Sequence, residues 1–266
     1  MVRALVGPLL AALVATSGCA NKKNEGITNT GAIAVYTEQF SAEIDPNSVR
    51  KWFVLIEGDG AAWPTPTRPP VDPTPRDPVL LSLAEIIQHK TKANVLYMAR
   101  PCQYPEKIKT NCQVRDWTTD RFAVRHTDAV MDTLTNRIPI GSEITLFGFS
   151  GGGVMALQLA SLLRPRYTLE KIVLAGTPVD VDTWTESNGY SRLTLNNYRE
   201  SLQILASQSV PIFALFGDRD TNVSDKHLGI ADEVGLTIEA YSLPNTSHAN
   251  LPIANVTIEI LTRPER

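Results

Sequence analysis

Short apolar runs alternate with segments of helical spacing along most of the chain. The run Lys-Trp-Phe-Val-Leu-Ile at residues 51–56 is nearly continuous, which is typical of a strand buried on both faces. Comparable runs predict strands at residues 31–40, 94–99, 144–147, 171–175, 211–216 and 236–243. Helices are predicted at residues 79–89, 118–137, 151–163, 224–234 and 250–261. This alternation predicts an α/β protein with a mostly parallel central sheet and helices on both faces.

Two segments depart from the alternation. Seven prolines between residues 64 and 78 exclude a helix or a central strand and predict an extended surface loop that borders a site. Residues 181–209 carry no strong strand pattern and end in a helical segment. We expect this second segment to form at most a small cap.

One predicted strand-to-helix turn carries a serine between glycines. Residues 148–152 read Gly-Phe-Ser-Gly-Gly, which is the G-x-S-x-G pattern of a nucleophile elbow. The following helix would point free N–H groups at the position where an oxyanion forms. Ser150 is therefore a candidate nucleophile. The alternative is a glycine-rich turn that only packs tightly; a P-loop is disfavoured because no Lys-Ser/Thr pair follows.

Three further segments fall just beyond predicted strands. They are Glu57-Gly-Asp-Gly60, Asp220 and His248. In parallel sheets, functional side chains gather at the carboxyl ends of the strands. We therefore expect these segments and Ser150 to meet at one edge of the sheet.

The first 18 residues have the features of an export signal. A short positive start precedes an apolar stretch at residues 5–14, which is too short for a comfortable membrane span, and small residues lead to Cys19. This ending resembles a bacterial lipobox, with Thr16 where leucine is usual. The resemblance implies that Cys19 is lipidated and, with Ala20 after it, anchors the protein in the outer membrane, facing the periplasm. The alternative is a plain signal peptide and a soluble periplasmic or secreted product.

With Cys19 assigned to lipid, Cys102 and Cys112 remain as an even pair. An exported protein meets an oxidising compartment, so we expect a disulfide between them; the alternative is two buried thiols. No Cys-x-x-Cys or His-x-x-x-His spacing occurs, and no metal site is predicted. Residues 19–30 are polar and predict a tether that leads to one folded domain, residues 31–266.

The composition narrows the function classes. The chain has 266 residues, of which 43% are hydrophobic, and this suits one domain with a substantial core. The formal net charge is −3, so the chain has no excess of basic residues, and nucleic acid is not an expected partner. No feature of the sequence predicts an oligomeric state.

Together these motifs resemble those of the α/β-hydrolases, over residues 35–261. The chain order Ser150, Asp220, His248 matches that family, and Gly-Asp-Arg-Asp at residues 217–220 resembles its acid turn. Residues 99–104, with Cys112 and a tryptophan at 117, also resemble a subgroup of proteobacterial lipoproteins that carry this fold. The resemblance implies Ser150 as nucleophile, His248 as general base and Asp220 as the residue that orients the imidazole, without a cofactor.

The same resemblance implies an oxyanion hole. The N–H of Gly151 would be one donor, and Asp59 or Gly60 would supply the second. Glu57 stands where the family usually has histidine, and Asp59 stands where small neutral residues are common. A carboxylate aimed at the oxyanion would oppose catalysis, so we predict that the Asp59 side chain turns away and bonds the proline-rich loop.

Other residues compete for these roles. Asp218 and Asp180 are rival acids. His89 and His126 are expected at the surface or at helix ends. Four aromatic residues are candidates for lining a pocket: Trp63, Tyr104, Trp117 and Trp184.

The expected reaction is hydrolysis of a carboxylic ester, from a small molecule or a lipid, through an acyl-serine intermediate. One alternative is another acyl-transfer enzyme with the same residues: an amidase, a peptidase, a thioesterase or an acyltransferase. The other is a non-catalytic envelope binding protein that retains the fold.

Overall fold

The strands form one sheet, as the alternation predicts. The computed structural model describes residues 3–4, 28–29, 34–38, 50–61, 70–107, 111–164 and 166–264. Within them the sheet order is β1-β9-β8-β7-β6-β4-β5-β3-β2. The strands are β1 (Arg3–Ala4), β2 (Thr28–Asn29), β3 (Ala34–Glu38), β4 (Lys51–Ile56), β5 (Asn94–Met98), β6 (Glu143–Phe149), β7 (Thr168–Ala175), β8 (Ile212–Gly217) and β9 (Glu239–Leu243).

The six strands β4 to β9 are parallel and form the centre of the sheet. At one edge β3 runs antiparallel to β5, and β2 runs antiparallel to β3. At the other edge β1, from the predicted leader, pairs parallel with β9. The carboxyl ends of β4, β6, β8 and β9 therefore point the same way, as the site hypothesis requires.

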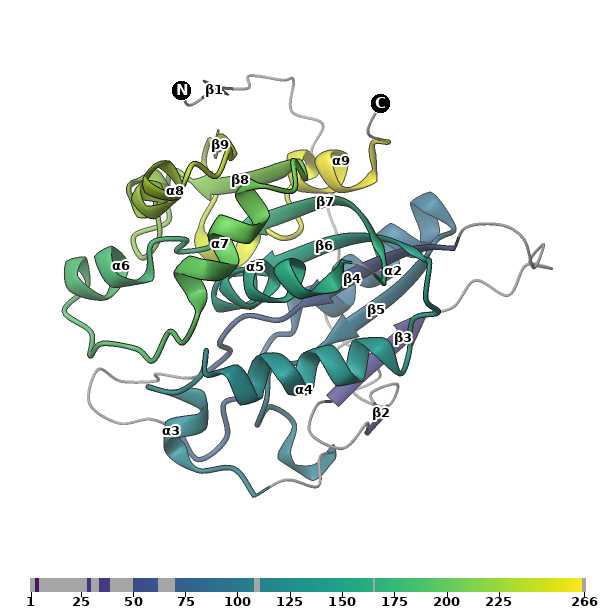
Figure 1. The fold of residues 1–266 in the computed structure, drawn as a ribbon, viewed down its shortest axis with the longest axis horizontal. Helices are drawn as coiled ribbons and strands as arrows, with labels where there is room; N and C mark the ends of the chain where they lie inside the picture. Colours follow the sequence, from purple (N-terminus) through teal and green to yellow (C-terminus); the bar gives the residue numbers. More distant parts are fainter. Residues whose placement is uncertain are drawn as a thin grey trace.

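Helices cover both faces of the sheet (Figure 1). The helices α4, α5 and α7 lie on one face, and α2 and α9 lie on the other. The helix bounds are α2 (Val79–Thr91), α3 (Val114–Trp117), α4 (Val124–Thr135), α5 (Gly151–Leu163), α6 (Val181–Ser187), α7 (Tyr198–Ala206), α8 (Gly229–Val234) and α9 (Asn255–Thr262), with 3-10 turns η1 (Pro105–Lys107), η2 (Asp225–Leu228) and η3 (His248–Asn250). None of the helices in the described ranges has both the length and the apolar character to cross a membrane.

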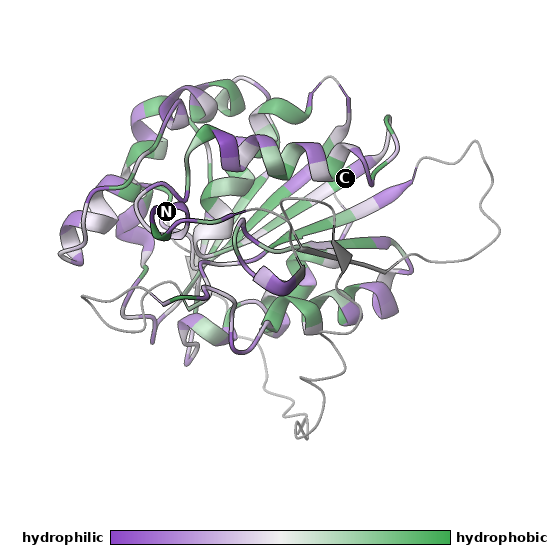
Figure 2. Cartoon of the chain, turned by 90° about the horizontal axis from the view of Figure 1, so that it is seen from below, coloured by the Kyte–Doolittle hydropathy of each residue, from purple (hydrophilic) through white to green (hydrophobic). Residues whose placement is uncertain are grey.

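The double coverage explains the continuous apolar run of β4. Val54 and Ile56 pack into the core on one side of the sheet, while Phe53 and Leu55 pack into the core on the other. Figure 2 shows the hydrophobic strands enclosed between the two layers of helices. Because β4 buries both of its faces, alternation of polar and apolar residues along it would leave polar groups in a core.

The predicted helix at residues 118–137 is wrong in its first part. The structure has the short α3, a turn, and then α4. The turn inserts Phe122 into the core, where its carbonyl accepts a hydrogen bond from Gln158 Nε2 on α5. Asp120 in the same turn accepts a hydrogen bond from Thr194 Oγ1. These tertiary contacts interrupt a segment that has helical spacing throughout.

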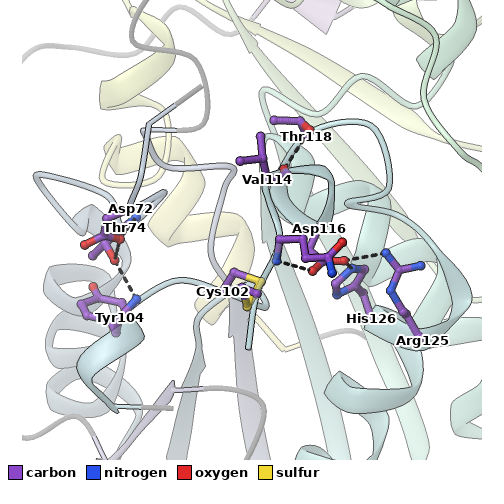
Figure 3. Close-up of a disulfide and its surroundings, with 11 residues drawn as sticks. Asp72, Thr74, Cys102, Tyr104, Val114, Asp116, Thr118, Arg125 and His126 are labelled. Atoms are coloured by element: carbon purple, nitrogen blue, oxygen red, sulfur yellow. Dashed lines mark hydrogen bonds and ion pairs between the residues drawn. A yellow bond between two sulfur atoms is a disulfide. The ribbon is translucent and has the colours of Figure 1, made fainter. Parts of the chain in front are cut away.

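The predicted disulfide is present. Cys102 and Cys112 are bonded, with their Cα atoms 5.7 Å apart. The bond ties the segment after β5 to the residues that lead into α3 (Figure 3). In the same view Asp116 of α3 lies against His126 and Arg125 of α4, and Arg125 Nη2 is 2.7 Å from Asp116 Oδ1.

We expect Cys102→Ser to lower the free energy of unfolding by about 2–3 kcal/mol, because the bond closes a loop with a sequence separation of 10. Urea unfolding followed by circular dichroism measures the change. Dithiothreitol should lower the stability of the wild type by a similar amount and leave the variant unchanged. If dithiothreitol frees both thiols of the wild type but leaves its free energy of unfolding unchanged, the disulfide has no stabilising role.

Candidate active site

Ser150 occupies a strained turn between β6 and α5. Its backbone angles are φ 52° and ψ −126°, a conformation that few non-glycine residues adopt. The Ser150 N–H donates to Ala175 O at 2.8 Å, and Ser150 O accepts from Gly153 N–H at 2.9 Å. A Cβ on Gly148 would lie 2.3 Å from the Cα of Gly153, so only glycine permits this approach of strand and helix. The turn has the geometry expected of a nucleophile elbow.

His248 and Asp220 form a hydrogen-bonded pair beyond β9 and β8. His248 Nδ1 lies 2.5 Å from Asp220 Oδ2. The other carboxylate oxygen of Asp220 accepts the N–H groups of Asn222 at 2.9 Å and Val223 at 3.0 Å. Burial raises the pKa of Asp220, but the hydrogen bond and charge of His248 and the two N–H donors outweigh it and hold the pKa below its usual value. Asp220 is therefore a carboxylate that fixes Nδ1 of the imidazole as a donor.

Ser150 and His248 line the same cavity, which has a volume of about 570 Å³. The ring of Phe149 lies beside that of His248, with centroids 5.0 Å apart. Pro75, Arg76 and Asp77, from the described part of the proline-rich segment, also border the cavity, as predicted.

The segment at residues 181–209 contributes one wall of this cavity. Trp184 of α6 and Tyr190 line it, and their rings lie 5.1 Å apart. Trp184 Nε1 donates to Asn222 O at 3.1 Å, which ties α6 to the turn that carries Asp220. The helix α7 packs instead against α5. Only the first part of the segment therefore acts as a cap.

The loop after β4 reaches the cavity beside Ser150. Glu57, Gly58, Asp59 and Gly60 all line it. The N–H of Gly58 donates to Glu57 Oε1 at 2.9 Å, and no acceptor for the N–H of Asp59 or Gly60 lies among the described residues. Gly151 begins α5, so its N–H has no acceptor within the helix. The N–H groups of Gly151, Asp59 and Gly60 remain the candidate oxyanion donors.

Glu57 is buried beneath this loop. Its carboxyl group accepts hydrogen bonds from Gly58 N–H and, at 3.2 Å, from Tyr97 OH. Burial raises the pKa of Glu57 to about 7, against the opposing effect of these two donors. Where the family resemblance leads one to expect histidine, the chain thus has an acid that is partly protonated near neutral pH.

Our prediction for the partner of Asp59 was wrong. The carboxylate does not bond the described part of the proline-rich loop; Oδ1 lies 3.0 Å from Arg100 Nη1, and Oδ2 lies 3.2 Å from Arg121 Nε. Both arginines come from segments more distant in sequence, after β5 and before α4. The sequence holds no local signal for such a contact.

The rival acids have other roles. Asp218 is exposed and accepts a hydrogen bond from Thr246 N–H, and Asp180 caps α6 by accepting from Thr183 N–H. His89 is exposed and lies in the last turn of α2, and His126 lies in the first turn of α4, so both are at helix ends as expected. His126 is buried, and burial with the charges of Arg125 and Arg100 lowers its pKa to about 4.

Of the four candidate aromatic residues, Trp184 lines the cavity. Tyr104 is buried against Tyr97, and Trp117 lies at the end of α3. Trp63 lies outside the described residues. The lining residues that our sequence analysis missed include Arg121, Tyr190 and Asn222. They occur in irregular segments, where no periodic pattern distinguishes them.

A second serine–histidine contact lies near α6. His227 Nε2 is 3.1 Å from Ser187 Oγ, and His227 Nδ1 accepts the N–H of Ser224. Since Nδ1 is an acceptor, the neutral ring carries its proton on Nε2 and donates it to Ser187. This histidine is therefore in the wrong tautomer to take a proton from its serine.

Similar solved structures share the fold. No protein-family model and no curated protein matches the chain. Est1E from Butyrivibrio proteoclasticus, solved with ferulic acid bound, aligns over 89% of this chain and 94% of its own with a TM-score of 0.54 and 11% identity. An esterase from Mycobacterium tuberculosis aligns over 94% and 98% with a TM-score of 0.55 and 13% identity. Mouse α/β hydrolase domain-containing protein 10 aligns over 89% and 94% with a TM-score of 0.53 and 13% identity.

The chain has the α/β-hydrolase fold. At these identities the likeness shows the fold and not the chemistry. Within this fold, Ser150, Asp220 and His248 lie on the turns after β6, β8 and β9, as their order in the sequence predicts.

We expect Asp220→Asn to lower kcat for an ester substrate by roughly 10⁴-fold, because an amide favours the wrong imidazole tautomer. Asp218→Asn is the matched control; it removes a nearby exposed carboxylate and should leave kcat near the wild-type value. Steady-state kinetics measures both, and thermal unfolding checks that both fold. A larger loss in Asp218→Asn would reverse the assignment of the acid.

Proposed function

We propose that this protein is a serine hydrolase that cleaves carboxylic esters through an acyl-enzyme on Ser150. The observation that carries the proposal is the shared cavity. It is lined by a serine on a strained strand-to-helix turn and by a histidine whose Nδ1 is held by a buried carboxylate. The esterases among the similar structures support the reaction class.

In the proposed reaction, the Nε2 atom of His248 accepts the Ser150 proton as Oγ attacks the ester carbonyl. The tetrahedral oxyanion receives hydrogen bonds from the N–H of Gly151 and from that of Asp59 or Gly60, and each such donor contributes about 3 kcal/mol to the transition state. The imidazolium then gives its proton to the leaving alkoxide, and an alcohol departs. Water, deprotonated by His248, attacks the acyl-serine and releases the carboxylic acid.

Asp220 supports both steps. As a carboxylate it holds the Nδ1–H of His248 and stabilises the imidazolium that forms twice in each cycle. The depressed pKa of Asp220 means that, as the pH falls, it stays ionised to a lower pH than an ordinary aspartate does. No step of this mechanism calls on a cofactor.

The aromatic wall favours a substrate with a flat group. Trp184, Tyr190 and Phe149 line the cavity that holds Ser150. Flat rings suit an arrangement of this kind, since aromatic pairs prefer offset or tilted contacts at centroid distances of about 4.5–7 Å. The ferulic acid bound in Est1E is an aromatic carboxylic acid, and we propose esters of aromatic or other planar acids as the first substrates to test.

We further propose that the protein is exported and carries a lipid on Cys19, which anchors it in the outer membrane facing the periplasm. The leader pattern supports this, and so does the disulfide, because disulfides persist in oxidising compartments. A cleaved, unanchored periplasmic or secreted form is the alternative.

Ser150→Ala should abolish ester hydrolysis, with a loss of several orders of magnitude in kcat, because the residues of such a site act as a unit. The variant should also lose covalent labelling by a fluorophosphonate. The matched control is Ser187→Ala, which removes the serine of the second serine–histidine contact and should retain both signals. Labelling that persists in Ser150→Ala would exclude Ser150 as the nucleophile.

Cys19→Ala should move the protein from the membrane fraction to the soluble periplasmic fraction and abolish metabolic labelling with a radioactive fatty acid. Cys102→Ala, which removes a cysteine from the folded domain, should leave fatty-acid labelling intact. A wild type that takes up no fatty acid and fractionates as a soluble protein would support the unanchored alternative.

A further inference from the structure

Two buried arginines flank the loop that borders the catalytic serine. The side chains of Arg100 and Arg121 are 5% and 4% exposed, and each contacts a different oxygen of the Asp59 carboxylate. Arg100 Nη2 also donates to Arg121 O at 2.8 Å, which joins the two segments. Both guanidinium groups lie over the ring of Phe122, at 5.0 and 5.4 Å from its centroid. The cluster is therefore a buried group of charges and not an exposed surface pair.

The Asp59 carboxylate lies next to the first turn of α5. A Cβ placed on Gly151 would be 2.2 Å from Asp59 Oδ1, so only the absence of a side chain at Gly151 allows the contact. Gly151 is also the residue whose N–H we assign to the oxyanion. A negative charge thus stands close to the position where the reaction develops a second negative charge.

An isolated carboxylate at this position would oppose catalysis. Two like charges about 5 Å apart, in a site of effective dielectric about 20, repel strongly enough to slow a reaction on the order of 100-fold. Here two guanidinium groups face one carboxylate. Burial lowers the pKa of Arg100 to about 10, so it stays protonated at neutral pH. The two arginines and Asp59 together then carry a net positive charge. Two further acidic residues, Glu57 and Asp77, also line the cavity.

The same contacts orient the backbone of the loop. Gln103 Nε2 donates to Gly58 O at 2.9 Å, and its Oε1 accepts the N–H of Arg100 at 2.8 Å. With the side chain of Asp59 held by the arginines on one side of the loop, the N–H groups of Asp59 and Gly60 stay without an acceptor among the described residues. Free N–H groups beside a nucleophilic serine are what an oxyanion hole requires.

We propose that Arg100 and Arg121 are positioning residues of the oxyanion hole: they neutralise the Asp59 carboxylate beside Gly151 and hold the loop so that its free N–H groups face the oxyanion. The inference rests on the proposed ester hydrolysis. On this proposal the two arginines have two roles: they neutralise the charge of Asp59, and they hold the loop after β4.

The test is a double-mutant cycle on Arg121 and Asp59, with p-nitrophenyl acetate as the substrate. Arg121→Gln should lower kcat about 10-fold with little change in KM, less than the effect of an isolated carboxylate, because Arg100 still pairs with Asp59 and only part of the neutralising charge is lost. The double variant Arg121→Gln/Asp59→Asn should regain most of that loss, since no carboxylate remains to be neutralised. Arg121→Lys, which keeps the charge, should lose less than Arg121→Gln.

Controls separate this role from a purely structural one. Titration of active sites with a fluorophosphonate normalises each rate to the folded, reactive fraction. Arg125→Gln removes a nearby arginine that pairs with Asp116 and Asp120, and it should keep the wild-type kcat. If Arg121→Gln does not fold, Arg100→Gln with and without Asp59→Asn carries the same comparison.

Two results would overturn the inference. One is an Arg121→Gln enzyme with the wild-type kcat, and the other is a double variant no faster than the single one. If instead the proposed function is wrong, the wild type itself will show neither ester hydrolysis nor Ser150-dependent labelling.

Discussion

The site depends on the close approach of β6 and α5 at residues 148–153. Gly148 and Gly153 touch across the turn, and Ser150 between them adopts a strained backbone conformation that a looser turn would relax. Core packing maintains this strain, because β6 is buried in the centre of the sheet and nearly every residue of α5 is buried. A turn in an exposed hairpin would have no comparable restraint. The packing of β6 and α5 in the core thus fixes the position of Ser150.

The parallel sheet brings the other groups to the same edge. Asp220 follows β8 and His248 follows β9, and these two strands are neighbours, so their turns are adjacent although the residues are 28 positions apart. Backbone N–H groups at Asn222 and Val223 then select one oxygen of Asp220 and leave the other for the imidazole. Sheet topology therefore supplies proximity, and local turn geometry supplies orientation.

Much of this arrangement was predictable, and the exceptions have physical causes. The bounds of β4 agree with its apolar run because strands buried on both faces produce an unambiguous pattern. The places of Ser150, Asp220 and His248 after β6, β8 and β9 were predictable, because each follows an apolar run in the sequence. The break between α3 and α4 was not, because Phe122 leaves the helical path to fill the core. The partners of Asp59 were not predictable either, since contacts between irregular segments have no period.

The loop after β4 shows how the fold compensates for unusual residues. Its acids, Glu57 and Asp59, are held by Tyr97 and by two arginines, and its backbone is held by Gln103. Three of the residues that bond this loop or its acids, Tyr97, Arg100 and Gln103, lie in or just after β5.

The segment that carries Arg100 and Gln103 is itself strained. Cys102 and Tyr104 have positive φ angles of 74° and 55° without being glycine, and Cys102 is bonded to Cys112. The disulfide restrains this segment within two residues of both Arg100 and Gln103. Reduction of the bond would release the segment that holds the loop after β4, while Ser150, Asp220 and His248 would keep their own restraints in the sheet. The disulfide therefore restrains the loop after β4 through Arg100 and Gln103, in addition to its effect on global stability.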